Sequence, residues 1–307
     1  MKYIAGKTEF KLHNSAVSLG KFDGLHIGHQ LLIDKTISLK EEGYTSAVFS
    51  FQYSPRNLFS EVDIQFIYTE EEKKKKLQER GVDVFISYPF SKETANMEPE
   101  RFVKEVLVDH MDTKVIVVGS DFGFGRNRSG NIELLRKLSK KYGYKLIVYD
   151  KVTLEDTIIS SSLIRKELAE GNIKLVNQML GSPYSIMGEV IHGRKFGRTI
   201  GMPTINILPD DNKLLPPNGV YASRVLIHGK SYDSVTSIGY KPSVGKEEKK
   251  GVETYIFDFH DDLYGEIVDI RLYDFEREEV KFDSTLELSQ QMHQDVLWAK
   301  KILTSNK

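Results

Sequence analysis

The sequence predicts two domains, an α/β domain on a parallel sheet followed by an antiparallel β-barrel. A chain of 307 residues is long enough for two domains of ordinary size. Its first half alternates short β-rich runs with helix-length segments, the rhythm of a parallel sheet. From about Pro183 to Phe282 the pattern changes to short alternating runs punctuated by Gly and Pro, which is typical of a small antiparallel barrel or sandwich.

The expected elements follow in order along the chain. The strands of the first domain are Ser15–Leu19, Thr45–Phe51, Val82–Tyr88, Lys114–Val118 and Lys145–Tyr149. The helices are Glu98–Met111, Asn131–Tyr142 and Ser160–Gly171, which should cover both faces of the sheet, and an amphipathic terminal helix, Ser284–Leu303. The charge run Glu70–Lys76 pairs each Glu with a Lys four residues later, which favours a solvated helix face. We place the domains at 1–182 and 183–307.

Composition excludes several classes of function. Lys and Arg number 43 against 44 Asp and Glu, so the chain projects no strong field toward nucleic acid or an anionic membrane. The sequence has no cysteine, which excludes disulfides, thiolate metal sites and cysteine nucleophiles and fits a reducing cytoplasm. We find no signal peptide and no apolar run of membrane-spanning length, and we expect a cytoplasmic protein.

A histidine pair lies where the first predicted strand turns into a helix. His26 and His29 are three residues apart, so their side chains can face the same way at the helix start. The free N–H groups and dipole there favour a phosphate, and imidazoles add donors that can be charged. Two ordinary surface histidines are the alternative, and further ligands for a metal are not found nearby.

Two further segments follow strands of the same sheet. Gly123-Phe124-Gly125, with Gly130, can wrap a ligand or form an ordinary turn, and its spacing matches neither the dinucleotide fingerprint nor a Walker A loop. Ser160, Ser161 and Ser162 precede a helix, either as a plain N-cap or, with Arg165, as a phosphate site. Open α/β folds bind ligands at such strand ends.

These segments carry a resemblance to a known family. Gly20 to His29 resembles the signature of nucleotidyltransferases that release pyrophosphate from ATP. Val118–Gly125 and Ile159–Arg165 are similar to further motifs of the prokaryotic bifunctional riboflavin kinase/FAD synthetases. The resemblance implies a Rossmann-like domain in which His26, His29, Ser160 to Ser162 and Arg165 meet the ATP phosphates, and Asp121 with Phe122 borders the flavin. The ATP-binding loop then also includes Gly20, Lys21, Phe22, Asp23 and Gly28.

The second half offers another anion and metal site. Gly193, Gly197, Arg198 and Gly201 form a glycine-spaced basic loop, suited to phosphates although a decorated hairpin turn is the alternative. Thr204 and Asn206 follow on one face of an extended segment and offer two neutral oxygens to Mg²⁺.

A carboxylate in the second half suits a catalytic base. Glu253 shares a face with Tyr255, Phe257 and Phe259, and a base is wanted when the nucleophile is a neutral alcohol. The alternative is a Glu253 on the outside of the barrel.

The second half is similar to the kinase module of the same family. The resemblance implies that Thr204 and Asn206 hold Mg²⁺ with the nucleotide, that Glu253 is the base, and that Arg277 with the terminal helix borders the flavin. The chain departs from the family pattern at four positions: Ser54 replaces a histidine, Ser162 and Ser243 replace threonine, and Ile205 replaces alanine. Ser for Thr keeps a hydroxyl, whereas Ile205 adds bulk beside Thr204.

We therefore expect a bifunctional enzyme with ATP, riboflavin and FMN as substrates and Mg²⁺ as cofactor. It phosphorylates riboflavin to FMN in the barrel and adenylylates FMN to FAD plus pyrophosphate in the α/β domain. The alternatives are an FAD synthetase with a degenerate flavin-binding barrel, and a flavin sensor that turns nothing over. We expect no nucleic acid or membrane partner, and the sequence does not predict an oligomeric state.

Overall fold

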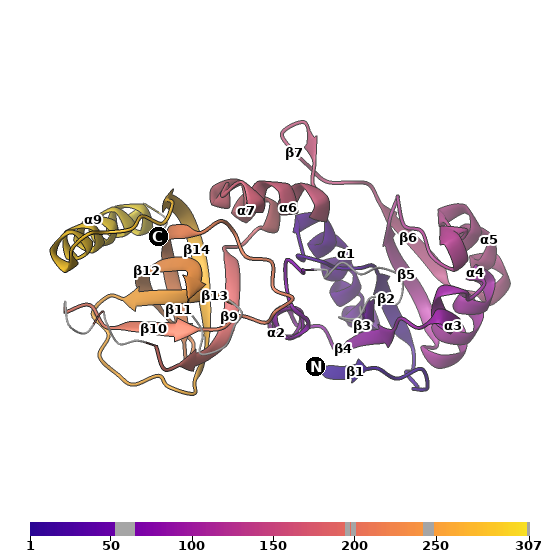
Figure 1. Ribbon diagram of the computed structural model, residues 1–307. Coiled ribbons are helices and arrows are strands. Elements are labelled where there is room, and N and C mark those ends of the chain that lie inside the picture. The colour runs from indigo at the N-terminus through magenta and orange to yellow at the C-terminus, as the bar shows by residue number, and fades with distance from the viewer. Residues whose placement is uncertain (53–64, 194–196, 198–200, 242–248, 306–307) are drawn as a thin grey trace. The chain divides into compact units, whose positions relative to one another are not determined.

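The computed structural model describes residues 1–52, 65–193, 197, 201–241 and 249–305. Contacts divide the chain into two compact units, Met1–Ser160 and Ser161–Lys307. Figure 1 shows a sheet with helices in the first unit and a barrel in the second. This confirms the predicted fold class. Because the contacts group residues 161–182 with the barrel, their assignment to the first domain stays a prediction.

The first unit is built on a six-stranded parallel sheet. In the order β1-β4-β3-β2-β5-β6, its strands are Lys2–Ala5, Val84–Pro89, Thr45–Gln52, Ser15–Leu19, Thr113–Gly119 and Lys145–Tyr149. All five predicted strands are present within two residues at either end. The sequence analysis missed β1, because this four-residue edge strand has one buried residue and too little pattern to be noticed.

Helices cover both faces of this sheet, as predicted. The larger ones are α1 (Ile27–Ser38), α2 (Glu70–Arg80), α4 (Pro99–Arg101) continuing into η2 (Phe102–His110), and α5 (Ile132–Tyr142). Shorter elements are η1 (Leu39–Glu42), α3 (Lys92–Ala95), η3 (Arg126–Arg128), β7 (Thr153–Leu154) and β8 (Thr157–Ile158). α1 lies on the opposite side of the sheet from α4 and α5 (Figure 1). Every residue of β2 is therefore buried, as in other doubly covered parallel sheets.

The strand order creates a crevice between β2 and β5. From β2 the chain moves to β3 and β4 on one side, then returns to β5 and β6 on the other. Such a reversal leaves space outside the carboxyl ends of the two central strands, where open α/β sheets bind ligands. Those ends carry residues 20–29, here called the histidine loop, and the Gly119–Gly125 segment.

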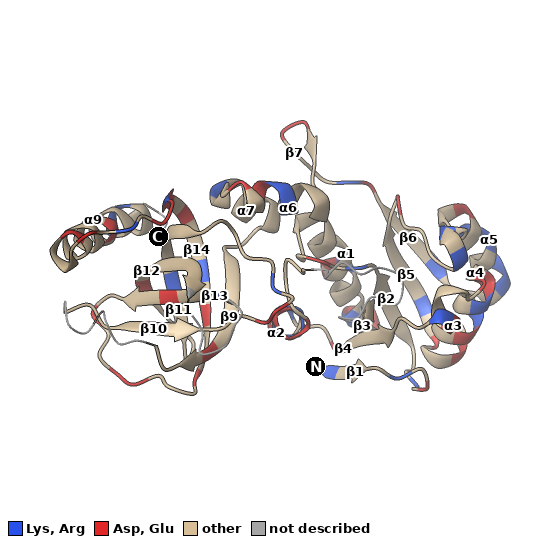
Figure 2. Ribbon diagram, viewed as in Figure 1, with Lys and Arg blue, Asp and Glu red and all other residues tan. Residues whose placement is uncertain are grey.

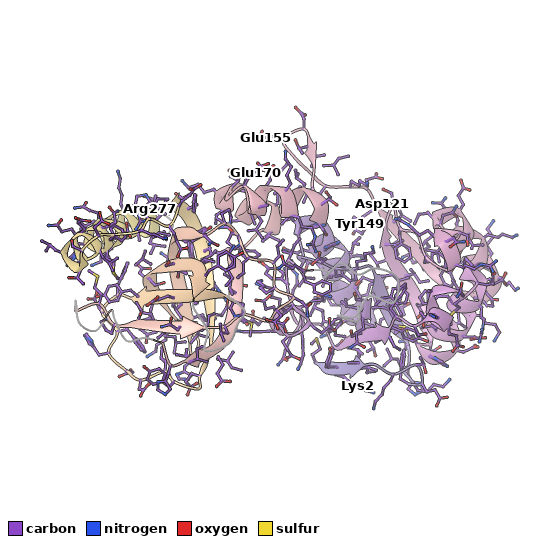
Figure 3. The ribbon with its side chains drawn as sticks, viewed as in Figure 1. Lys2, Asp121, Tyr149, Glu155, Glu170 and Arg277 are labelled. Carbon is purple, nitrogen blue, oxygen red and sulfur yellow. The ribbon has the colours of Figure 1, made fainter. Side chains whose placement is uncertain are left out.

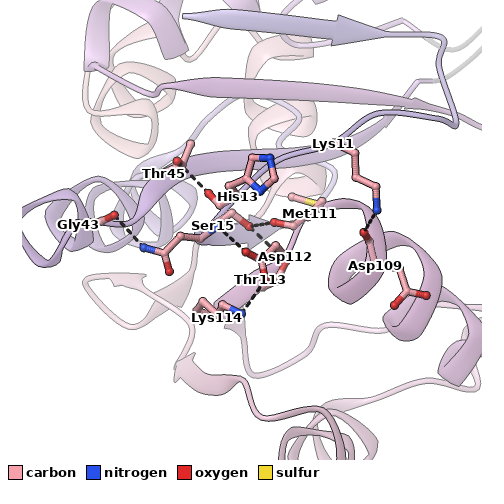
Figure 4. Close-up of polar contacts among 11 residues, drawn as sticks. Lys11, His13, Ser15, Gly43, Thr45, Asp109, Met111, Asp112, Thr113 and Lys114 are labelled. Atoms are coloured by element: carbon pink, nitrogen blue, oxygen red, sulfur yellow. Dashed lines mark hydrogen bonds and ion pairs between the residues drawn. The ribbon is translucent and has the colours of Figure 1, made fainter.

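The amino ends of the same strands are closed by their own polar groups (Figure 4). The Ser15 hydroxyl donates to the Met111 carbonyl at 2.7 Å, and the Asn14 amide donates to Asp112 at 2.9 Å. Lys114 forms an ion pair with Asp112 at 2.6 Å. These contacts satisfy the polar groups at this edge.

In its described residues, the second unit comprises a closed antiparallel barrel and the helices α6, α7 and α9. The barrel order is β10-β13-β12-β11-β14-β9, closed between β9 and β10. These strands are Thr204–Ile207, Lys249–Ile256, Lys230–Lys241, Gly219–Ile227, Ile267–Arg277 and Tyr184–Ile191. The helices are α6 (Ser161–Ala169), α7 (Ile173–Leu180) and the terminal α9 (Thr285–Thr304), which starts at the N-cap Ser284.

The charge run on α2 differs from its prediction in two ways. Glu71 and Lys74 pair at 3.0 Å over three residues rather than four, as do Glu70 and Lys73 at 3.6 Å. Glu72 and Lys73 are buried, so the run is only partly a solvated face. Figure 2 shows both signs on α2 and mostly basic residues on α5. Among the described residues, no helix is long and apolar enough to cross a membrane.

Candidate active sites

A buried aromatic ring, that of Phe22, supports the histidine loop. Phe22 is fully buried, and a Cβ on Gly20 would come within 3.0 Å of its ring. The His29 ring meets the Phe22 ring edge to face, at 5.2 Å between centroids. The Asp23 carboxylate accepts the Ile67 amide at 3.0 Å and so ties the loop to the segment before α2. Phe22 and Asp23 therefore shape the loop from within, whereas the Lys21 side chain is exposed.

The two predicted histidines stack on one another at the start of α1. Their ring centroids are 3.6 Å apart and the planes differ by 20°. His26 is the N-cap, and its Nδ1 accepts the backbone N–H of His29 at 3.3 Å. Because Nδ1 is an acceptor, the proton of the neutral ring lies on Nε2, which is then a donor. A Cβ on Gly28 would come within 3.2 Å of the His26 ring, so the glycine leaves room for the imidazole.

Both imidazoles are neutral at neutral pH. The sequence analysis, in contrast, expected donors that can be charged. Burial lowers the pKa of His26 to about 4, although the carboxylates of Asp23 and Asp121 act in the opposite direction. Burial also lowers the pKa of His29 well below its usual range, and the electrostatic interactions with a protonated His26 and with the Lys73 ammonium act in the same direction. A neutral imidazole still donates a hydrogen bond, so the pair can bind phosphate oxygens without carrying charge itself.

The Gly119–Gly125 segment meets the histidine loop at the predicted edge of the sheet. Asp121 follows β5, pairs with Lys151 at 3.0 Å, and acts electrostatically on His26. Figure 3 labels Asp121 and Tyr149 at the carboxyl ends of β5 and β6. Phe122 stacks on Phe124 at 5.6 Å and packs against the core, with its side chain partly exposed. The flavin role of Asp121 and Phe122 stays a prediction.

The serine segment spans the division between the two units. Ser160 is the last residue of the first unit, and Ser161 begins α6 in the second. Ser162 is exposed, and Arg165 lies half-buried on the second turn of α6. Their predicted meeting with the ATP phosphates is untested.

A second site lies on the outer face of the barrel. β10 and β13 are neighbours, and Asn206 stands opposite Glu253 in the register. The Thr204 hydroxyl donates to a Glu253 carboxylate oxygen at 2.6 Å. All three residues line a cavity of about 1210 Å³. The structure thus brings together the residues predicted to bind metal and the predicted base.

Glu253 faces outward, but it is not left in open solvent. On β13 it alternates with Val252 and Thr254, which are buried, and it shares its face with Tyr255. α9 covers the neighbouring part of this face, where Ala299 and Leu303 join a buried cluster. The Glu253 side chain therefore points away from the barrel interior, as in the alternative interpretation. α9 and the segment before it turn that outer face into the wall of a pocket.

The glycines of the basic loop allow two close approaches. A Cβ on Gly193 would overlap the Asn206 amide, and one on Gly197 would overlap the Met202 carbonyl. The Met202 amide donates to the Gly197 carbonyl at 2.8 Å, two residues before Thr204. Arg198 lies outside the described residues, as do Ser54 and Ser243.

A smaller cavity of about 460 Å³ adjoins the first one at Thr204, which lines both. Its other walls include Ile205, Phe259, Leu263 and Tyr264. The family departure at Ile205 therefore belongs to the wall of the smaller cavity.

Arg277, which is labelled in Figure 3, lines the large cavity and makes an interaction that the sequence analysis missed. Its guanidinium makes two contacts with Asp295 of α9, at 2.6 and 3.1 Å, and Gln291 donates to the same carboxylate at 2.7 Å. Asp295 is 3% exposed. The repeat of apolar residues that predicted α9 gave no reason to single out an aspartate on its buried side.

Two family models match the chain in succession. The FAD synthetase model matches residues 9–163, and the riboflavin kinase model matches residues 180–303. A bifunctional riboflavin kinase/FMN adenylyltransferase from Buchnera aphidicola is 37% identical over the full length of both chains. The chain belongs to this bifunctional family. It therefore has both the FAD synthetase and the riboflavin kinase module.

Further relatives agree with this assignment. The Listeria monocytogenes protein with the same description is 34% identical and covers 92% of this chain and 90% of its own length. The Escherichia coli protein is 35% identical and covers 92% and 91%. A crystal structure described as a macrolide-efflux protein from Streptococcus pneumoniae is 30% identical, has a TM-score of 0.85, and covers 97% of this chain and 98% of its own.

Proposed function

We propose that the two sites perform successive steps with distinct residues. The barrel transfers the terminal phosphate of ATP to riboflavin and releases FMN and ADP. The parallel-sheet unit transfers AMP from a second ATP to FMN and releases FAD and pyrophosphate. The observation that carries the proposal is the Thr204–Glu253 hydrogen bond at the junction of two cavities, in a chain that also carries a stacked histidine pair at a helix start.

In the barrel, the smaller cavity suits the nucleotide and the larger one suits the flavin. The larger cavity runs from Thr204, Asn206 and Glu253 to Arg277, and includes the apolar side chains of Leu288 and Met292. An apolar wall with a few polar groups at one end fits an aromatic ring system that carries a hydroxylated chain. The reacting hydroxyl then lies near Thr204, where the cavities meet.

Glu253 is the proton acceptor of the kinase step. The nucleophile is a neutral primary alcohol, which loses its proton as the new O–P bond forms. A positioned base contributes about 10²- to 10⁴-fold to such a step. The Thr204 hydroxyl donates to Glu253 and fixes the direction of the carboxylate.

In the adenylyl-transfer step, the nucleophile is an FMN phosphate oxygen that is already anionic, so a base is not needed. The site has to position the reactants and stabilise the charge on the leaving pyrophosphate. His26 and His29 act as neutral donors, together with the free N–H groups at the start of α1. Arg165 and Ser160 to Ser162 are proposed to bind the same phosphates.

Thr204 and Asn206 suit Mg²⁺ in the barrel. Both supply neutral oxygens, Glu253 adds a carboxylate beside them, and Mg²⁺ prefers oxygen ligands while taking the rest from phosphates and water. Among the described residues, no group of three or more His, Cys, Asp or Glu forms a metal site. When bound, the ion neutralises phosphate charge. We infer a cytoplasmic setting from the absence of cysteine.

The direct test starts two reactions with the purified protein, ATP and Mg²⁺, one from riboflavin and one from FMN. Chromatography then separates riboflavin, FMN and FAD. We expect FMN and FAD from riboflavin, and FAD from FMN. FAD from FMN alone would mean that the barrel is degenerate, and flavin binding without any product would favour a sensor.

A further inference from the structure

A lysine of α2 is buried close to the histidine pair. Lys73 is 5% exposed, and its ammonium lies 3.6 Å from a Glu70 carboxylate oxygen, which is longer than a hydrogen bond. Glu70 also accepts the Tyr3 hydroxyl at 3.0 Å, so it is shared. Among the described residues, the ammonium also lies over the Phe85 ring, 5.9 Å from the ring centroid. Burying a cation costs free energy unless it is well paired, so this placement calls for a reason beyond packing.

The start of α2 is held against the histidine loop. The Ile67 amide donates to Asp23, and the Ile67 side chain would meet a Cβ on Gly24 at 3.1 Å. Thr69 then caps α2, in a reciprocal arrangement with Glu72. Lys73 follows on the next turn, and its positive field reaches His29. The lysine is therefore part of the same assembly as the His26–His29 stack.

We propose that Lys73 is a positioning residue of the adenylyl-transfer site, because its buried ammonium provides a fixed positive charge beside the His26–His29 stack that attracts the ATP phosphates. The proposal rests on the function proposed above. It adds the charge that the histidines themselves lack.

The charge present at this site when ATP arrives depends on which of these groups is protonated. Two imidazoles stacked 3.6 Å apart repel one another if both gain a proton, and a proton on His29 is also disfavoured by the charge of Lys73. The charged and titratable groups that act on the pair are Lys73 on His29, and Asp23 and Asp121 on His26. Without the Lys73 charge, His29 takes up a proton more easily, and the site then exchanges a fixed charge for one that depends on pH.

The test compares Lys73→Gln with Lys74→Gln. Lys74 is the next residue of the same helix, is partly exposed and pairs with Glu71, so its loss changes the net charge equally. Lys73→Arg keeps the charge, and Lys73→Met is a second neutral variant of similar length that tolerates burial. For each folded variant, NMR follows the imidazole signals of His26 and His29 against pH. Calorimetry gives the dissociation constant of ATP at pH 6 and pH 8.

We expect Lys73→Gln and Lys73→Met to raise the pKa of His29. At pH 8 they should weaken ATP binding about ten- to a hundredfold, the equivalent of one lost charged contact. Lys73→Arg and Lys74→Gln should resemble the unmodified protein.

An unchanged His29 titration and unchanged ATP affinity in a folded neutral variant would overturn the proposal. A lower melting temperature alone, with both readouts unchanged, would show a purely structural lysine. Failure of the unmodified protein to make FAD from FMN would refute the proposed function instead, since the titration does not depend on turnover.

Discussion

Replacing Gly193 with alanine should damage the kinase site and spare the other site. A Cβ there would lie 2.7 Å from Asn206 Cγ and nearer still to the amide nitrogen. Carbon atoms in contact are usually about 3.5 to 4.0 Å apart, so one group has to move by about 1 Å. Asn206 is paired with both Ile191 and Glu253, so β10 cannot easily shift and the amide itself turns away. A displacement of about 1 Å from a productive geometry can cost about 10²-fold in rate.

The assay measures FMN formation from riboflavin and FAD formation from FMN in the same preparation. We expect the first rate to fall about 10²-fold and the second to be unchanged. The second rate shows that the parallel-sheet unit is folded, and the fluorescence of Trp298 on α9 reports the folding of the barrel unit. Gly229→Ala is the matched control. It has a φ of +80° in the β11–β12 turn and no atom within 4 Å of a Cβ, so it strains the backbone without touching the site. Normal kinase activity in Gly193→Ala would refute the idea that Asn206 must lie where it does.

Three other changes test separate contacts. Thr204→Val removes the hydroxyl that donates to Glu253, and we expect FMN formation to slow about tenfold or more, with Thr204→Ser restoring most of it; equal rates in both variants would contradict this. Asp295→Asn breaks a buried ion pair that holds α9, and such losses cost about 3 to 5 kcal/mol. The fluorescence of Trp298, the chain's one tryptophan, should report earlier unfolding of α9 together with a higher riboflavin KM. The folded pKa of His26 lies below its unfolded value, so its contribution to stability is full above about pH 6.5 and is lost as the pH falls toward about 4. That amounts to about 2 kcal/mol between pH 8 and pH 5, and calorimetry of His26→Ser, which keeps a capping side chain, should show a weaker pH dependence; an equal slope would refute the pKa assignment.

The fold was predictable because its signals are local. Ser15–Leu19 and Lys145–Tyr149 have the predicted bounds, since each is a short β-rich run between turn residues, fully buried in the first and only partly buried in the second, which is an edge strand. β1 was missed because it is a short edge strand that is stabilised by pairing with β4 rather than by a pattern of its own. The order of the strands, with its reversal between β2 and β5, depends on tertiary pairing that the alternating pattern does not contain.

The site was predictable where one motif carries neighbouring residues. His26 and His29 stack because a spacing of three residues at the start of a helix places both side chains on the same side. Thr204 and Asn206 are two residues apart and share a face of one strand. Their charge state was not predictable, since it depends on burial and on Lys73 from another helix. The Arg277–Asp295 pair joins residues 18 positions apart and likewise requires the packing of α9 on the barrel.

The central claim is that one chain holds two independent active sites, and a pair of variants tests it most directly. Glu253→Gln should lose FMN formation but still make FAD from supplied FMN, while His29→Ala should do the reverse. Neither variant alone should convert riboflavin to FAD, and a mixture of the two should, because FMN released by one is used by the other. A single substitution that abolished both reactions in a folded protein, or a mixture that made no FAD although each variant kept its own step, would contradict the account.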